Sequence, residues 1–128
     1  MGGELSVTVR SERGVVVAEV AGEIDVSTVP SLKERLFPLA DGGQPLIIDL
    51  NGISFIDSTG LGALVATARR ASEHGGSLQA VCSQPHTRRL LWLTGVDRRI
   101  PLTATLDGAL MHLTASPDAS PNGDAARE

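Results

Sequence analysis

Residues 46–65 read LIIDLNGISFIDSTGLGALV, and this stretch decides the fold class of the chain. It opens with residues 46–50, a nearly unbroken apolar run of the kind that forms a strand buried on both faces of a sheet. A short connection at 51–57 then leads into a helix that begins near Ser58. The helix carries an apolar stripe formed by Leu61, Leu64, Val65 and Ala68. A buried strand followed directly by an amphipathic helix predicts an α/β fold with parallel strands.

The chain on both sides continues the alternation of strands and helices. Residues 5–10 alternate between apolar and polar side chains, and residues 15–21 are apolar except for Glu19. The two segments are therefore predicted to pair as a hairpin across a loop at 11–14. The remaining predicted elements are helices over 29–39, 87–94 and 106–113 and strands over 77–83 and 100–103. This order predicts an α/β domain with a mostly parallel sheet of four to five strands, an antiparallel edge strand and about four helices.

Length and composition indicate a single domain. The chain has 128 residues, which suits one hydrophobic core, and its aromatic content of 2% means that this core must be aliphatic. The folded domain is expected to span residues 1–115. Residues 116–128 are rich in Pro, Asp, Ala, Asn and Gly and have no apolar anchor, so they are predicted to be a disordered tail.

Charge and cysteine content argue against several classes of function. The net charge of −4 and the pI of about 5.3 argue against direct binding to nucleic acid, which relies on clustered basic residues. A single cysteine, Cys82, excludes an internal disulfide and a multi-cysteine metal site. The sequence has no signal-peptide pattern and no apolar run of the roughly 18–20 residues needed to cross a bilayer. A cytoplasmic protein without a metal ion or membrane contact is therefore expected.

Ser58 lies in the part of the sequence with the clearest functional signal. It falls at or near the N-terminus of a helix, on the side of the sheet where the strand ends, and α/β proteins usually bind ligands there. Gly60 and Gly62 remove side chains from the first helical turn and let another molecule approach the backbone. The simplest structural interpretation is that Ser58 caps the helix, and the functional interpretation is that Ser58 is modified.

Two enzymatic interpretations of the same segment are weak. The Gly60-x-Gly62 spacing resembles part of a dinucleotide fingerprint, but Val65 stands where the third glycine is needed and no P-loop lysine is present. A nucleophilic serine needs an activating base, and the G-x-S-x-G elbow is absent. The chain has three histidines, none obviously placed beside the serine: His74, His86 and His112. No catalytic residue is therefore assigned, and the protein is not expected to be an enzyme.

Three segments closely resemble the anti-sigma factor antagonists of the STAS domain family: FIDSTGLGALV at 55–65, GEIDVSTVPSLKERL at 22–36 and GGSLQAV at 75–81. The similarity runs in register from about residue 5 to residue 114, and the D-S-T-G-L-G string is specific for the members that are phosphorylated. The resemblance implies that Ser58 is the phosphorylation site. It also implies a partner-binding surface formed by Gly22, Glu23, Asp25, Asp57, Ser58, Thr59, Gly60, Leu61 and Gly62.

The resemblance further implies bacterial transcription regulation by partner switching, as in stress responses and sporulation-like signalling. The unphosphorylated antagonist is expected to bind an anti-sigma factor that is also a serine kinase, and this binding releases the sigma factor. Phosphorylation of Ser58 inactivates the antagonist, and a metal-dependent serine phosphatase restores it. ATP and magnesium belong to the kinase, so this chain needs no cofactor of its own. The free protein is expected to be a monomer.

Two residue roles and one alternative function stay open at this level. Asp57 is either a recognition residue or the cap of the helix, and Asp25 is either a turn former or a partner contact. A phosphate on Ser58 would meet free N–H groups and the positive end of the helix dipole, so phosphorylation is expected to act at the interface and not by unfolding. The alternative function is a STAS scaffold or ligand-sensing module without a phosphorylation cycle.

Overall fold

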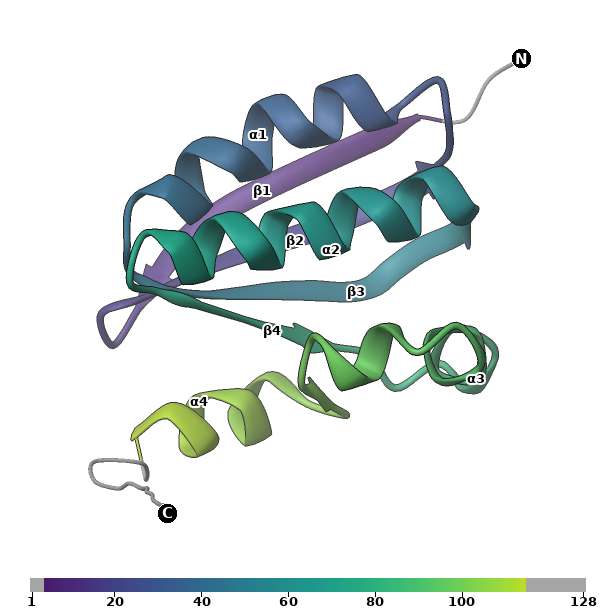
Figure 1. Ribbon diagram of the computed structural model, residues 1–128. Coiled ribbons are helices and arrows are strands. Elements are labelled where there is room, and N and C mark those ends of the chain that lie inside the picture. The colour runs from purple at the N-terminus through teal and green to yellow at the C-terminus, as the bar shows by residue number, and fades with distance from the viewer. Residues whose placement is uncertain (1–3, 115–128) are drawn as a thin grey trace.

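A computed structural model describes residues 4–114 of the chain, and Figure 1 shows how its elements are arranged. In chain order these are β1 (Leu5–Glu12), β2 (Val15–Ile24), α1 (Val29–Asp41), β3 (Pro45–Ile56), α2 (Ser58–Glu73), β4 (Ser77–Val81), α3 (Pro85–Leu93), the 3-10 helix η1 (Val96–Arg98), β5 (Leu102–Thr103) and α4 (Leu106–Thr114). The predicted alternation of strands and helices after an opening hairpin is confirmed. The predicted tail at 116–128 lies outside the described residues.

The five strands form one sheet in the order β1-β2-β3-β4-β5. β1 and β2 are antiparallel and every other neighbouring pair is parallel, as the sequence predicts. The hairpin is tighter than expected, because β1 continues to Glu12, which pairs with Val15. Only Arg13 and Gly14 remain in the turn, and both have positive φ, 57° and 79°, as a type I′ turn requires.

Helices cover both faces of the sheet. α1 and α2 lie side by side over one face (Figure 1), and α4 packs against the other face, where its buried residues join a separate core cluster. β3 passes between the two layers, with Leu46 and Ile48 on the side of α1 and α2 and Ile47 on the side of α4. Each of these three side chains is at most 1% exposed, so the apolar run at 46–50 is buried on both faces as predicted.

β3 is longer than the sequence pattern predicts. It does not end at residue 50 before a connection at 51–57, because the strand continues through Ile56. Its second half pairs with the end of β2 across irregularities in the register. Gly52, which suggests a turn, instead lets the two strands pass closely, since a Cβ there would lie 3.0 Å from Cβ of Ala21. The extension carries β3 to the start of α2 with only Asp57 between them.

Candidate functional site

Ser58 is the first residue of α2, and its side chain is exposed. Its hydroxyl forms no hydrogen bond with any residue in the range 4–114. The preceding residue, Asp57, caps the helix: its Oδ1 accepts a hydrogen bond from the N–H of Gly60 at 2.9 Å. The interpretation of Ser58 as the cap is therefore wrong, because the extended backbone and short acceptor side chain of Asp57 take that position. The Ser58 hydroxyl stays free to react or to meet a partner.

The residues that follow in the first turn of α2 divide into an exposed and a buried set. Thr59 and Gly62 are exposed, whereas Gly60 and Leu61 are buried. A Cβ at Gly60 would lie 2.5 Å from Cγ2 of Ile24, so this glycine lets the helix begin close to the sheet. Nothing lies within 4 Å of the corresponding point at Gly62. Another molecule therefore has room to approach at Gly62 and not at Gly60, which corrects the expectation that both glycines open the backbone.

The loop between β2 and α1 lies beside the start of α2. The N–H of Asp57 donates to the carbonyl oxygen of Ile24 at 3.1 Å and ties the two segments together. Oδ1 of Asp25 accepts hydrogen bonds from the N–H of Ser27 at 2.9 Å and from the N–H of Thr28 at 3.1 Å. The hydrogen bond from the Ser27 hydroxyl is the main reason that the pKa of Asp25 lies below its ordinary value. Asp25 is thus a turn former at the entry to α1, and its contact with a partner stays a prediction.

Gly22 and Glu23 are half-buried near the end of β2. Gly22 has a φ of 105°, and a Cβ there would overlap the carbonyl oxygen of Glu4. The N–H of Glu23 donates to the same carbonyl oxygen at 3.1 Å. The backbone just before β1 therefore requires a glycine at this point and fixes where the loop to α1 begins.

Two exposed apolar side chains, Val26 and Phe55, lie close in the chain to the site, and the sequence pattern does not single them out. Val26, in the loop before α1, is 70% exposed, and Phe55, near the end of β3, is 51% exposed. Phe55 pairs with Glu23 and so lies at the same end of the sheet as that loop. A strand predicted to continue through Ile56 would have placed Phe55 on one of its faces. Asn51 and Gly52 are typical of a turn, however, so the sequence pattern ends the strand before Phe55. Exposed apolar side chains at this end of the sheet would add apolar area to an interface formed there.

The site offers a hydroxyl without an activating base. A shallow depression of about 510 Å³ adjoins Ser58, and within the described part of the chain no histidine or acidic residue lines it. His74 follows the last residue of α2 and so lies at the opposite end of that helix. Among residues 4–114, no group of three or more His, Cys, Asp or Glu side chains could hold a metal ion. The arrangement therefore presents the hydroxyl to an external reagent.

No helix within the described range combines the length and the apolar character needed to cross a bilayer.

Comparison with known proteins identifies the family. The model of the STAS domain family matches residues 6–109. The chain is 37% identical over 106 residues to the anti-sigma-B factor antagonist of Bacillus subtilis, covering 83% of this chain and 97% of that protein. It is 36% identical over 107 residues to the anti-sigma-F factor antagonist RsfB of Mycobacterium tuberculosis, covering 83% of this chain and 87% of that protein.

A solved structure agrees with these sequence relatives. The crystal structure of an anti-sigma factor antagonist from Mycobacterium paratuberculosis matches with a TM-score of 0.79 at 35% identity, covering 87% of this chain and 95% of that chain. The five-stranded sheet and the helices on its two faces are therefore the fold of that antagonist as well. On the family match and these likenesses, the chain belongs to the STAS domain family and is similar to its anti-sigma factor antagonists.

Proposed function

We propose that this chain is an anti-sigma factor antagonist controlled by phosphorylation of Ser58. In the unphosphorylated state it binds an anti-sigma factor that is also a serine kinase, and the sigma factor held by that kinase is released. The observation that carries the proposal is the exposed and unbonded hydroxyl of Ser58 on the first turn of α2, in a chain whose relatives are named as antagonists of anti-sigma factors.

The kinase transfers the γ-phosphoryl group of ATP to Oγ of Ser58. The new O–P bond forms as the bond to the β-phosphate oxygen breaks, ADP leaves, and the hydroxyl proton passes to a base on the kinase. A metal-dependent serine phosphatase later hydrolyses the ester with water and releases inorganic phosphate. Because the base, ATP and magnesium belong to the partner enzymes, the antagonist itself needs neither a catalytic residue nor a cofactor.

The position of Ser58 favours a switch that acts at the interface. A phosphate at the first residue of α2 lies near free N–H groups and the positive end of the helix dipole, which stabilises it by about 0.3–1 kcal/mol. The same phosphate adds a charge of about −1.5 to −2 beside the carboxylate of Asp57. In a closed interface that charge either loses its hydration or repels the partner, and both effects weaken binding. A 1,000-fold loss of affinity corresponds to about 4 kcal/mol, which one misplaced charge can supply.

The binding surface that we propose combines polar and apolar side chains at one end of the sheet. The residues of α2 that reach the surface there are Ser58, Thr59 and Gly62. Val26 and Phe55 add exposed apolar area, which is the usual source of affinity at the centre of an interface. The remaining residues of the predicted surface support it from below, because they fix the backbone of the loop before α1 and of the first turn of α2. These buried or half-buried residues are Gly22, Glu23, Asp25, Asp57, Gly60 and Leu61.

The test uses the purified anti-sigma factor kinase from the same organism with magnesium and ATP. We expect mass spectrometry to find phosphate on Ser58 alone. Ser58→Ala should stay folded, bind the kinase and resist phosphorylation, whereas Ser58→Asp should fold but bind poorly. Thr59→Ala is the matched control, because Thr59 carries a neighbouring exposed hydroxyl and should be dispensable for phosphate transfer.

The phosphoswitch proposal fails if the kinase labels another residue and leaves Ser58 unmodified. Binding of the kinase without any phosphate transfer would instead favour a scaffold that has no phosphorylation cycle.

A further inference from the structure

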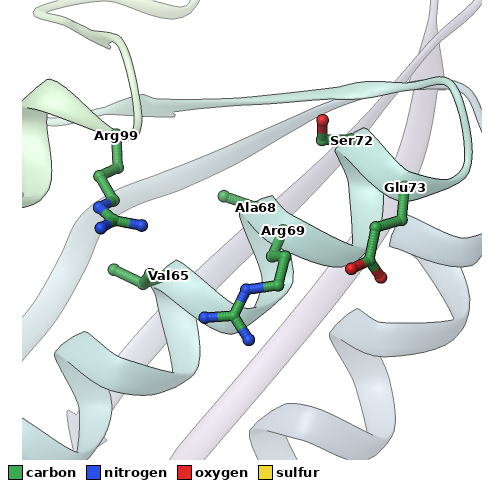
Figure 2. A pocket seen from close by; sticks show the side chains of 6 residues that line it. All are labelled: Val65, Ala68, Arg69, Ser72, Glu73 and Arg99. Atoms are coloured by element: carbon green, nitrogen blue, oxygen red, sulfur yellow. The ribbon is translucent and has the colours of Figure 1, made fainter.

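A groove runs along α2 from Ser58 toward the C-terminal end of the helix. It consists of two shallow depressions, one of about 510 Å³ that includes Ser58 and one of about 420 Å³ that extends to Glu73. The two depressions share three lining residues, Val65, Arg69 and Arg99, so they form one continuous groove between α2 and the segment around η1. Figure 2 shows the second depression, with both arginine side chains beside Val65.

The floor of the groove at the Ser58 end is apolar. Leu61 and Val96 line it and are only 8% and 7% exposed, and Val65 between them is half-buried. The entrance is open at Gly62, where nothing lies within 4 Å of the point that a Cβ would occupy. A side chain of another protein therefore has both room and an apolar surface to contact.

The rim of the groove carries two arginines along its length and one acidic residue, Glu73, at the end far from Ser58. Arg69 and Arg99 are both exposed, and among residues 4–114 neither side chain forms an ion pair or a hydrogen bond. Arg70 differs from its neighbour Arg69, because it binds Asp41 through Nε at 3.0 Å and Nη2 at 2.6 Å. The chain as a whole carries a net charge of −4, so two unpaired arginines over an apolar floor run against its overall charge. This combination suits a ligand with carboxylates around an apolar side chain.

We propose that this groove docks an acidic segment of the anti-sigma factor partner, with carboxylates at Arg69 and Arg99 and an apolar side chain over Val65. The inference rests on the proposed function and extends its interface along α2. It also gives the phosphate a direct means of action. Ser58 stands at one end of the same groove, so a phosphate there places negative charge beside the acidic segment and repels it.

The first experiment measures the dissociation constant of the purified kinase for the full chain at low and at high salt. Arg69→Glu combined with Arg99→Glu should weaken binding at least 10-fold at low salt, because the attraction becomes repulsion, and this loss should shrink at high salt, which screens both. The matched control is Arg35→Glu combined with Arg89→Glu, which makes the same change of charge at exposed residues outside the groove. We expect the control to bind within about 3-fold of wild type. Thermal melts should show that both double variants stay folded, since all four side chains are exposed.

A second experiment separates this proposal from the proposed function. The full chain is titrated with a synthetic peptide of alternating Glu and Leu and followed by NMR, and we expect shifts at the backbone amides of Val65, Arg69 and Arg99 that disappear in the double Glu variant. Kinase binding that is equal in wild type and in the double Glu variant would overturn the groove and leave the phosphoswitch standing. Peptide shifts in the groove with no binding of the kinase to wild type would overturn the proposed function and keep the chemistry assigned to the groove. A peptide that leaves the groove amides unshifted contradicts the proposal.

Discussion

The two glycines of the S-T-G-L-G string have different roles at the scale of single residues. Gly60 is buried and its Cα faces Ile24 and Ile56, whereas Gly62 points into open space. We expect Gly60→Ala to lower the free energy of unfolding by about 1–3 kcal/mol, because a methyl group would lie 2.5 Å from Ile24 and 2.8 Å from Ile56. Gly62→Ala is the control and should leave stability unchanged or raise it by up to about 1 kcal/mol through helix propensity. Urea unfolding of both variants measures the difference.

Gln79 is a second residue whose surroundings decide how it affects the free energy of unfolding. It is 3% exposed, and neither of its amide atoms has a hydrogen-bond partner among the described residues. Its partner in the parallel pairing, Ile47, belongs to the core beneath α4, so the Gln79 side chain lies on that apolar face. Gln79→Leu should raise the free energy of unfolding by about 1–2 kcal/mol, since it removes two unsatisfied polar atoms.

The control for Gln79 is Gln84→Leu, which should lower stability in the same urea titration. Gln84 donates from Nε2 to the carbonyl oxygen of Asn51 and so loses a hydrogen bond on substitution. A loss of stability in Gln79→Leu equal to that of the control would show that the Gln79 amide is satisfied in solution.

At the scale of the elements, the sequence predicts β3 and α2 well and the segment between them poorly. The apolar run at 46–50 has no other reasonable interpretation than a buried strand, and the stripe in α2 follows helical spacing. The pair Asn51 and Gly52 signals a turn, yet in the structure it continues the strand. The nearness of β2 explains this, because it requires a residue without a side chain at Gly52. Such a contact between Ala21 and Gly52, 31 residues apart, is not visible in local sequence.

The candidate site shows the same division between local and tertiary information. The resemblance points to Ser58, and the structure leaves the hydroxyl exposed. The helix begins at Ser58 as predicted, but the residue that caps it is Asp57 and not Ser58. Arg69 and Arg99 come together only through the packing of η1 beside α2, so no spacing in the sequence links them.

The cap of α2 allows the two roles considered for Asp57 to be separated. Asp57→Ala should lower the free energy of unfolding by about 1 kcal/mol, because the N–H of Gly60 loses its acceptor. Asp57→Asn keeps a capping oxygen and should retain most of that stability. If the kinase also recognises Asp57, it should phosphorylate the Asp57→Asn variant more slowly than wild type, although the melting temperatures of the two are the same. A normal rate of phosphate transfer in Asp57→Asn would leave capping as its role.

The far ends of α1 and α2 are joined by an ion pair that should make stability depend on pH. The hydrogen bond from Arg70 is the main reason that the pKa of Asp41 lies below its ordinary value. A carboxyl whose pKa is lower in the folded state contributes stability above its unfolded pKa of about 3.9 and loses it as the pH falls through the folded value. Asp41→Asn should therefore be less stable than wild type at pH 7, and the gap should narrow below about pH 4. Parallel melts at both pH values check this, and a gap that stays constant would contradict it.

At the scale of the whole molecule, the proposed phosphorylation site lies at one end of the layer formed by α1 and α2. α1 and α2 cover one face of the sheet and α4 covers the other (Figure 1), and each layer packs on its own core cluster. The side chain of Ser58, the first residue of α2, is exposed, so a phosphate on it should disturb the packing of either core cluster little. Information about the phosphate is therefore expected to reach the partner through the surface of the antagonist and not through a change of its fold.

This expectation can be tested by comparing the stability of the phosphorylated and unphosphorylated chains. Phosphate at the first residue of α2 should raise the melting temperature slightly or leave it unchanged, since about 0.3–1 kcal/mol of favourable dipole interaction corresponds to a few degrees in a domain of this size. Ser72→Asp is the matched control, because Ser72 is exposed in the last turn of α2, where the dipole has the opposite sign, and a negative charge there should lower the melting temperature. A large fall in melting temperature on phosphorylation of Ser58 would mean that the switch works by unfolding the antagonist, and repulsion at the partner's surface would then no longer be needed to explain release.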